Sequence, residues 1–342
     1  MKTTFRHLVF ASLLMAAGCA TPPEAPVSTP EPSPSSFSFI LFGDMPYSDS
    51  DREFLKRVVP DVKAAAPPFI VHLGDYKGGG ETCLSLYDGF FQSVFLDGVD
   101  PIPVFYTPGD NEWTDCDRFK DQRTGKTDSA LARLDTVRAL YFKDLPSGSA
   151  QFSAERQAEL VENSTWTHGG VRFLTLHQTG TNNGRDYVTG DRLDLALEEV
   201  SARDEANLKW LEAGFAKAKA EGAEAVVIGM QADMTDVASK PADVMCTTVA
   251  TDASNACDGH TALRAAIQRL ALDFQKPVLL MHGDTNPYTL DQSLSGEEAP
   301  NLWRLNAAGD GVQEIVTVTV APSADMPFSA TGFTTGKAPA SN

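Results

Sequence analysis

The chain has 342 residues, and its 46 acidic against 28 basic side chains give a formal net charge of −18 at pH 7. A chain this acidic, with no basic stripe to neutralise phosphates, argues against a nucleic-acid-binding protein. The span 37–322 is long enough for one large α/β domain or two small ones, and the sequence shows no second linker, internal repeat or composition shift, which favours one domain.

The first nineteen residues are typical of a secretory signal peptide. Two basic residues precede an apolar segment, 8–15, which is too short to span a membrane as a helix. Residues 15–19 (MAAGC) resemble the lipobox of bacterial lipoproteins, in which the cysteine is lipidated and becomes the first residue. Cys19 would then be the membrane anchor; an ordinary signal peptide that contains a cysteine is the alternative. Ala20, where inner-membrane lipoproteins usually have Asp, favours the periplasmic face of the outer membrane.

The segment 20–36 follows, with six prolines among small and polar residues. This composition cannot bury a core and predicts an extended stalk between the membrane and a folded domain over 37–322. The last residues, 323–342, are small and polar, and we expect a flexible tail there.

Four stretches carry apolar residues at the spacing of an amphipathic helix: 49–66, 129–142, 204–220 and 261–274. Pro60 favours a break within the first of them. The stretch 164–177 is typical of a hairpin that turns at Gly169 and Gly170. The alternating stretch 313–320 predicts a closing strand.

After Cys19, four cysteines remain, and an even number in an exported protein predicts two disulfides. Of the three pairings, we expect Cys246–Cys257, which closes a polar loop, and Cys83–Cys116, which ties together the loops after the second and third strands. A zinc site is the alternative, but the chain has no CxxC pair.

Four apolar stretches of strand length end at a Gly-Asp pair. They are 39–44 (FILFGD), 69–75 (FIVHLGD), 103–112 (PVFYTPGDNE) and 277–284 (PVLLMHGD), and a fifth, 225–233 (AVVIGMQAD), ends with Gln and Asp. Helical patterns between most of them predict an α/β fold, in which ligands bind just beyond the carboxyl ends of the strands. One Gly-Asp pair is commonly only a turn, but four of them favour carboxylates gathered around one crevice.

In this order, the blocks resemble those of the calcineurin-like metallophosphoesterases: Asp-x-His, Gly-Asp, Gly-Asn-His-(Asp/Glu), a later His, and Gly-His-x-His. The resemblance covers about 39–320 and is close at HLGDYKGGG, residues 72–80. A divergent bacterial branch of the family is the nearest match. The resemblance implies an α/β/β/α sandwich, in which two central mixed β-sheets are flanked by helices.

The resemblance also implies a metal site, but the chain departs from the family at nearly every histidine. Pro46 stands at the first metal-binding His, Asp110 at the metal-binding Asn, and Asn111 at the His that helps to protonate the leaving group. The ligand set that the resemblance implies is Asp44, Asp75, Asp110, Gln231, Asp284 and Asn286.

This set offers carboxylate and amide oxygens, which suit Mg²⁺ or Mn²⁺, whereas imidazole nitrogens suit zinc and iron. We expect one or two divalent ions, with Asp75 as the bridge where there are two. Two such ions can bind a phosphate ester, activate a water and stabilise the charge that develops in an in-line displacement.

The leaving group needs a proton, which Asn111 cannot supply. His282 lies two residues before Asp284 and would share its face in an extended segment, while His177 ends another strand. Both are candidate general acids. For each of them, a core residue that is hydrogen-bonded to the backbone is an equally good interpretation.

Together these features predict a metal-dependent phosphoesterase, monomeric and lipid-anchored, which hydrolyses a small-molecule phosphate ester with a metal-activated water. The replaced histidines favour an alternative: a catalytically degenerate relative that binds a ligand at the cell envelope. A purely structural envelope lipoprotein would explain the stalk but not the four Gly-Asp pairs.

Overall fold

The computed structural model describes residue 1 and residues 36–341, apart from 121–124, 236–239, 241–242 and 296–298. The signal peptide and the stalk expected over 1–36 therefore lie, but for their first and last residues, outside the described residues. The fold belongs to one compact unit, Pro34–Asn342. Within the described residues, no helix combines the length and the apolar character needed to cross a membrane.

The first sheet has five strands in the order β12-β11-β1-β2-β3. Its strands are β1 (Phe37–Phe42), β2 (Ile70–His72), β3 (Val104–Tyr106), β11 (Val316–Val320) and β12 (Phe328–Gly332). β1, β2 and β3 are parallel neighbours, so their carboxyl ends lie at one edge of the sheet. β11 lies between β1 and β12 and runs antiparallel to both.

The second sheet has seven strands in the order β4-β5-β6-β7-β8-β10-β9. They are β4 (Glu155–Arg156), β5 (Ser164–His168), β6 (Val171–Thr175), β7 (Ala225–Gly229), β8 (Val278–His282), β9 (Thr289–Asp291) and β10 (Leu302–Asn306). β6, β7, β8 and β10 are parallel. The predicted hairpin is confirmed, because β5 and β6 pair antiparallel across the two glycines.

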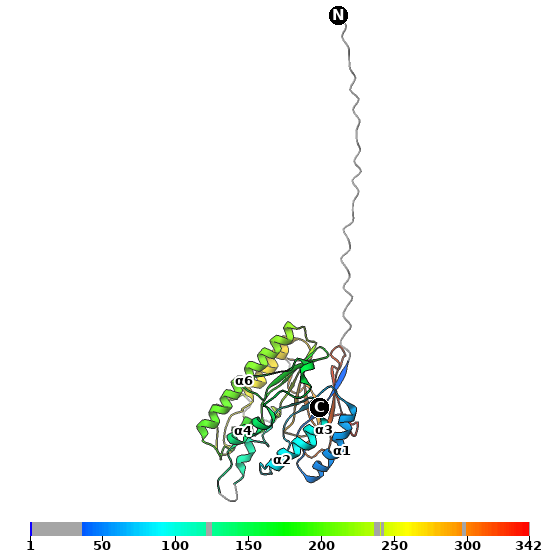
Figure 1. The fold of residues 1–342 in the computed structure, drawn as a ribbon. Helices are drawn as coiled ribbons and strands as arrows, with labels where there is room; N and C mark the ends of the chain where they lie inside the picture. Colours follow the sequence, from blue (N-terminus) through cyan, green and yellow to red (C-terminus); the bar gives the residue numbers. More distant parts are fainter. Residues whose placement is uncertain (2–35, 121–124, 236–239, 241–242, 296–298, 342) are drawn as a thin grey trace. The chain divides into compact units, whose positions relative to one another are not determined.

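The two sheets pack face to face and helices cover their outer faces. Alternate residues of both sheets form the central core, among them Phe39, Phe173 and Leu279. α1 (Asp49–Ala65) and α4 (Ala130–Tyr141) pack on the first sheet, and α6 (Leu193–Ala220) and α7 (Thr261–Phe274) on the second (Figure 1). Short helical segments are α2 (Ser85–Phe90), η1 (Phe91–Leu96), α3 (Asp97–Val99), η2 (Thr114–Arg118), η3 (Ser149–Phe152) and α5 (Gly180–Gly184). The predicted α/β/β/α sandwich is confirmed.

The four predicted helices are present, with two differences. α1 continues through Pro60, because this residue lies on the exposed face, where water can satisfy the carbonyl that loses its partner. α6 begins at Leu193 instead of residue 204. Its first turns bury Ala196, Val200 and Arg203, of which only Val200 is a large apolar residue, so the sequence shows no apolar stripe there.

Both predicted disulfides are confirmed. Cys83 and Cys116 are bridged with their Cα atoms 5.5 Å apart, and Cys246 and Cys257 with theirs 5.0 Å apart. The first joins the loop after β2 to η2, and the second closes the loop that precedes α7.

The prediction of a flexible tail over 323–342 is wrong for the central part of this segment. Phe328–Gly332 forms β12, which pairs antiparallel with β11. Phe328 and Ala330 are buried while Ser329 and Thr331 are exposed, so the short FSATG stretch has the alternation of an ordinary strand. Ala340 also bridges to Thr289 of β9.

Candidate functional site

Three of the four predicted aspartates lie in left-handed backbone directly after a strand. The φ angles are 52° at Asp44, 59° at Asp75 and 72° at Asp284, which follow β1, β2 and β8. Aspartate tolerates this region better than most residues, but still at a cost of about 1 kcal/mol. Backbone strain of this kind concentrates at functional sites. These turns present the carboxylates at the edge where the parallel strands end.

The aspartates meet around Gln231, which follows β7. Its Nε2 amide donates to Asp75 Oδ2 at 3.0 Å, to Asp110 Oδ1 at 3.0 Å and to Asp284 Oδ1 at 3.1 Å. Asp44 joins them because the backbone N–H of Asp284 donates to its Oδ1 at 2.7 Å. Five of the six predicted ligand residues, from both sheets, thus converge. We call them the strand-end cluster: Asp44, Asp75, Asp110, Gln231 and Asp284.

The glycine of two Gly-Asp pairs makes room for an aspartate of another pair. A Cβ atom at Gly109 would lie 2.0 Å from Asp75 Oδ1, and one at Gly283 would lie 2.0 Å from Asp44 Oδ2. Any side chain at either position would push a carboxylate out of the strand-end cluster. The repeated Gly-Asp pattern is therefore a packing requirement of the cluster as well as a turn signal.

Asn286, the sixth predicted ligand, is not brought together with the others. It is exposed, and its Nδ2 donates to Asp310 Oδ2 at 2.7 Å. Thr285 before it donates its hydroxyl to Asp233. The chain turns at Asp284, so residues 284 and 286 do not share a face as they would in a continuing strand.

The two predicted general acids are buried in the core. His177 is fully buried, with Nδ1 3.4 Å from Glu162 Oε1. His282 is also fully buried, with Nε2 3.8 Å from Asp233 Oδ1. Burial lowers the pKa of both rings. Among the described residues, neither ring is hydrogen-bonded to a carboxylate of the cluster. Nδ1 of His282 lies 2.9 Å from the carbonyl oxygen of Gly283, whereas, in the described part of the chain, neither ring nitrogen of His177 is hydrogen-bonded to the backbone.

Asn111 touches the cluster with its backbone. Its N–H donates to Asp75 Oδ1 at 3.1 Å, while its side chain packs against the loop at Gly79, where an added Cβ would lie 2.5 Å from Asn111 Oδ1. The residue thus positions Asp75, and its amide side chain is held against a glycine-rich loop.

Two further residues hold the aspartates in place. The Tyr47 hydroxyl donates to Asp75 Oδ2 at 3.0 Å and is 3.2 Å from Asp44 Oδ1. Glu112 accepts the backbone N–H of Asp75 at 2.8 Å and 2.9 Å with its two oxygens, and the hydroxyl of Tyr106 at 2.9 Å. Neither role was predicted from the sequence, although Tyr47 stands three residues after the first Asp and Glu112 two residues after the third.

Burial and mutual repulsion oppose ionisation of the cluster. Burial raises the pKa of Asp44 to about 7, against the hydrogen bonds from Asp284 and Tyr47 that lower it. Burial, and next the neighbouring Asp110, raise the pKa values of Asp75 and Asp284 well above their usual range. A cation at this point would favour the ionised carboxylates.

As the side chains stand, the described residues contain no group of three or more His, Cys, Asp or Glu with the arrangement of a metal site. Three carboxylates instead surround the amide nitrogen of Gln231. A metal ion between these carboxylates would require the Gln231 side chain to move away, or its amide group to rotate so that Oε1 replaces Nε2.

A cavity of about 350 Å³ lies beside the cluster, bounded in part by Asp110 and Asp284. The left-handed turn α5 forms one of its walls, with φ between 53° and 58° at Thr181, Asn182 and Asn183. The other lining residues come from the segments that follow α5, β7 and β8 and from the loop before α7: Asp186, Tyr187, Asp233, Lys240, Ala253, Asp258, His260 and Thr285.

Among curated proteins, none matches this chain. Among solved structures, a dimetal phosphatase from Danio rerio is 14% identical with a TM-score of 0.45, over 86% of this chain and 95% of that one. GAP50, the anchor in the inner membrane complex of Plasmodium, is 10% identical with a TM-score of 0.46, over 89% and 86%. TT1561 of Thermus thermophilus is 11% identical with a TM-score of 0.36, over 87% and 99%. At these values the similarities carry no argument about activity.

The family comparison is stronger. The family model described as calcineurin-like phosphoesterase matches residues 37–227, more than half of the 342 residues. The match runs from β1 into β7 and includes Asp44, Asp75 and Asp110, while Gln231 and Asp284 follow it. The chain therefore belongs to the calcineurin-like phosphoesterase family.

Proposed function

We propose that the protein is a metal-dependent phosphoesterase that hydrolyses a small-molecule phosphate ester. The observation that carries the proposal is the meeting of aspartates from four separate strand ends in one cluster, in which Asp44, Asp75 and Asp110 are buried and Asp284 is half-buried. Membership of a phosphoesterase family supports it. The adjacent cavity of about 350 Å³ has the size of a small-molecule site.

The donor set of the strand-end cluster fits a hard divalent cation. Three carboxylate oxygens lie within 3.1 Å of one amide nitrogen, and their repulsion would be relieved by positive charge. All the donors are oxygens, which favours Mg²⁺ or Mn²⁺ over zinc or iron. Gln231 would add its Oε1 only after the amide turns, because this oxygen now accepts the N–H of Gly180 at 2.5 Å.

Bound divalent metal would supply an activated water and offset the negative charge of the phosphoryl group. Two neighbouring residues hold the carboxylates that would bind the metal: Tyr47 and Glu112 fix Asp44 and Asp75 at the edge of the first sheet. The cavity would receive the organic part of the ester.

We also propose that the protein is exported and held by lipid on Cys19 at the periplasmic face of the outer membrane. The lipobox-like MAAGC sequence supports this, and so do the two disulfides, because such bonds persist in oxidising compartments. Cys19→Ser should abolish labelling with radioactive palmitate and move the protein from the membrane to the soluble fraction. Unchanged labelling would refute the anchor.

The activity is tested with 4-nitrophenyl phosphate and its bis ester in the presence of Mn²⁺ or EDTA. We expect turnover that requires the metal and that falls at least about 100-fold in Asp75→Asn, since the loss of metal binding removes several kcal/mol of stabilisation. Asp135→Asn, a substitution at an 80% exposed side chain on α4, is the matched control and should leave turnover unchanged.

A second candidate function is ligand binding without turnover. It is favoured because, within the described residues, no histidine contacts the strand-end cluster and an amide already donates into it. Mn²⁺ binding measured by calorimetry, lost in Asp75→Asn but accompanied by no turnover of either ester, would establish this function instead.

A further inference from the structure

The cavity beside the strand-end cluster offers few side-chain donors to a ligand, because most are already engaged. The Thr181 hydroxyl donates to Asp110 Oδ2 at 2.6 Å, and the Thr285 hydroxyl donates to Asp233 Oδ2 at 2.6 Å. Both hydroxyls are thus committed to carboxylates of the protein.

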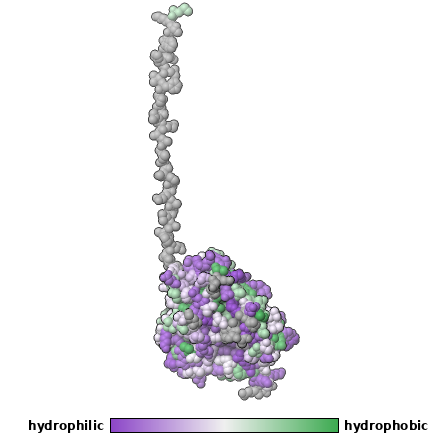
Figure 2. Space-filling model, turned by 180° about the vertical axis from the view of Figure 1, so that it is seen from behind, coloured by the Kyte–Doolittle hydropathy of each residue, from purple (hydrophilic) through white to green (hydrophobic). Residues whose placement is uncertain are grey.

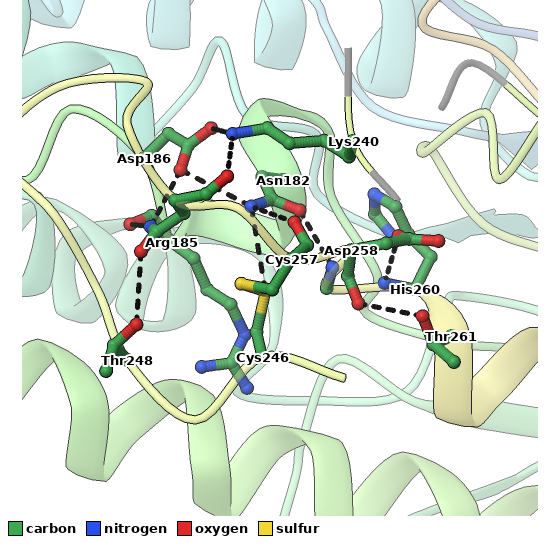
Figure 3. Close-up of a disulfide and its surroundings, with 12 residues drawn as sticks. Asn182, Arg185, Asp186, Lys240, Cys246, Thr248, Cys257, Asp258, His260 and Thr261 are labelled. Atoms are coloured by element: carbon green, nitrogen blue, oxygen red, sulfur yellow. Dashed lines mark hydrogen bonds and ion pairs between the residues drawn. A yellow bond between two sulfur atoms is a disulfide. The ribbon is translucent and has the colours of Figure 1, made fainter. Parts of the chain in front are cut away.

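The two longer donors of the cavity wall are engaged as well. Lys240 Nζ donates to the carbonyls of Ala253 and Asn255 at 3.1 Å and 2.8 Å, and it lies 2.7 Å from a carboxylate oxygen of Asp186. The Asn182 amide donates to the carbonyl of Cys257 and to Asp186, both at 3.3 Å. Figure 3 shows the contact between Lys240 and Asp186 and the contacts of Asn182 beside the Cys246–Cys257 disulfide.

Among the described residues that line the cavity, two side-chain donors have no described acceptor: the Tyr187 hydroxyl and Nε2 of His260. Tyr187 is 44% exposed and stands at the surface, whereas His260 is only 6% exposed. His260 is therefore the donor inside the cavity that remains available to a ligand.

Neighbouring residues fix the tautomer of His260. Gln178 Nε2 donates to Nδ1 of the ring at 2.9 Å. The orientation of the Gln178 amide is set by Asn207, which donates to its Oε1 at 3.4 Å. A neutral ring that accepts at Nδ1 carries its proton on Nε2. Burial lowers the pKa of His260 to about 4, against the opposing effect of Asp258, so the ring is neutral at pH 7.

The disulfide-closed loop fixes the place of His260. Its backbone N–H donates to Asp258 Oδ1 at 2.8 Å, and the N–H of Gly259 donates to Asn182 Oδ1 at 2.8 Å. The bridge at Cys257 lies three residues earlier, so the loop enters α7 in one position (Figure 3). This is the rigid support that a substrate-contacting side chain requires.

We propose that His260 is a catalytic residue that donates a hydrogen bond from Nε2–H to the ester oxygen of the bound substrate. The proposal rests on the proposed phosphoesterase function. When the P–O bond breaks, its electron pair goes to the ester oxygen, the attacking water gives its hydroxyl to phosphorus, and a proton of that water reaches the ester oxygen through solvent. His260 keeps its own proton, so a neutral ring is sufficient.

The role is tested with His260→Asn, using phenyl phosphate and 4-nitrophenyl phosphate as substrates in Mn²⁺. Asparagine keeps an oxygen for Gln178 but has no donor at the place of Nε2. We expect kcat to fall about 100-fold for phenyl phosphate, whose oxygen carries more charge as it leaves. For 4-nitrophenyl phosphate the loss should stay below about 10-fold, because the nitrophenolate needs less stabilisation. His260→Gln, with a longer amide donor, should recover part of the loss.

His168→Asn is the control, because His168 lies in the β5–β6 hairpin at the opposite end of the second sheet. His168→Asn should change kcat for phenyl phosphate and kcat for 4-nitrophenyl phosphate by the same factor or leave both unchanged. Equal losses for both esters in His260→Asn, or no loss, would overturn the role of His260 and leave the phosphoesterase function intact. Absence of metal-dependent turnover in the wild type would overturn both.

A second measurement needs no variant. In the wild type, log kcat/KM for a series of aryl phosphates should depend only weakly on the pKa of the leaving phenol, because a donor at the ester oxygen compensates a poor leaving group. A steep dependence in the metal-loaded wild type would contradict the proposal.

Discussion

At the scale of single residues, the hydroxyl of Tyr47 is the contact that joins Asp44 to Asp75 in the first sheet. Tyr47→Phe removes this donor and leaves the two carboxylates facing each other in a buried place. We expect the free energy of unfolding in EDTA to fall by about 1–3 kcal/mol, the cost of leaving a buried polar group without its hydrogen-bond partner. Urea unfolding at pH 8 measures it.

Tyr288 provides the matched control. Its hydroxyl is buried and has no partner among the described residues, so Tyr288→Phe removes an oxygen that contributes no hydrogen bond. The free energy of unfolding should stay the same or rise slightly. If both substitutions cost the same, the bridge between Asp44 and Asp75 would have no energetic value.

At the scale of elements, the last strand is part of the core. Phe328 of β12 is 1% exposed and packs in the cluster of buried residues between the two sheets. Phe328→Ala should lower the free energy of unfolding by about 3–5 kcal/mol, the usual cost of removing a buried phenyl ring. Ser329→Ala, at the next and exposed position of the same strand, should change it by less than about 0.5 kcal/mol. Equal effects in urea unfolding would mean that β12 does not pack as described.

Much of the element order could be predicted because its signals are local. Each apolar run with its Gly-Asp end encodes a strand and a turn, and parallel strands bring such ends together. The positions of His282 and Asn286 could not be predicted, since the rule that residues two apart share a face fails where Asp284 turns left-handed. His260 carries no local signal at all. Its place depends on contacts with Gln178 and Asn182, which are far away in the sequence.

At the scale of the whole molecule, the net charge of −18 is distributed between an exposed and a buried part. Figure 2 shows one face on which polar residues prevail and apolar ones form small separate patches. The exposed acids are solvated and screened, so they contribute little to stability. The buried aspartates of the strand-end cluster are different, because folding brings them together out of water.

The buried acids make the stability of the metal-free protein depend on pH. Burial raises the pKa of Asp44 to about 7, and burial with repulsion from Asp110 raises the pKa of Asp115 to about 8, both from 3.8. Above about pH 5 the unfolded chain has lost these protons, while the folded chain holds them until the pH passes about 7 at Asp44 and about 8 at Asp115. Stability therefore falls as pH rises, by up to about 1.4 kcal/mol per pH unit for each group.

The buried His72 and His260 do not cancel this slope above pH 6.5. Burial lowers the pKa of His72 to about 3 and that of His260 to about 4. Their contributions to the free energy of unfolding therefore change with pH only between these values and the unfolded pKa of 6.5, and they are constant at higher pH. Urea unfolding in EDTA at pH 6.5, 7.5 and 8.5 should show decreasing stability, and Asp44→Asn should flatten the decrease. Saturating Mn²⁺ should remove most of it, since a bound cation favours the ionised carboxylates. A metal-free stability that rises over this range would mean that the cluster carboxylates are ionised without a cation, and the case for a metal there would lose its electrostatic basis.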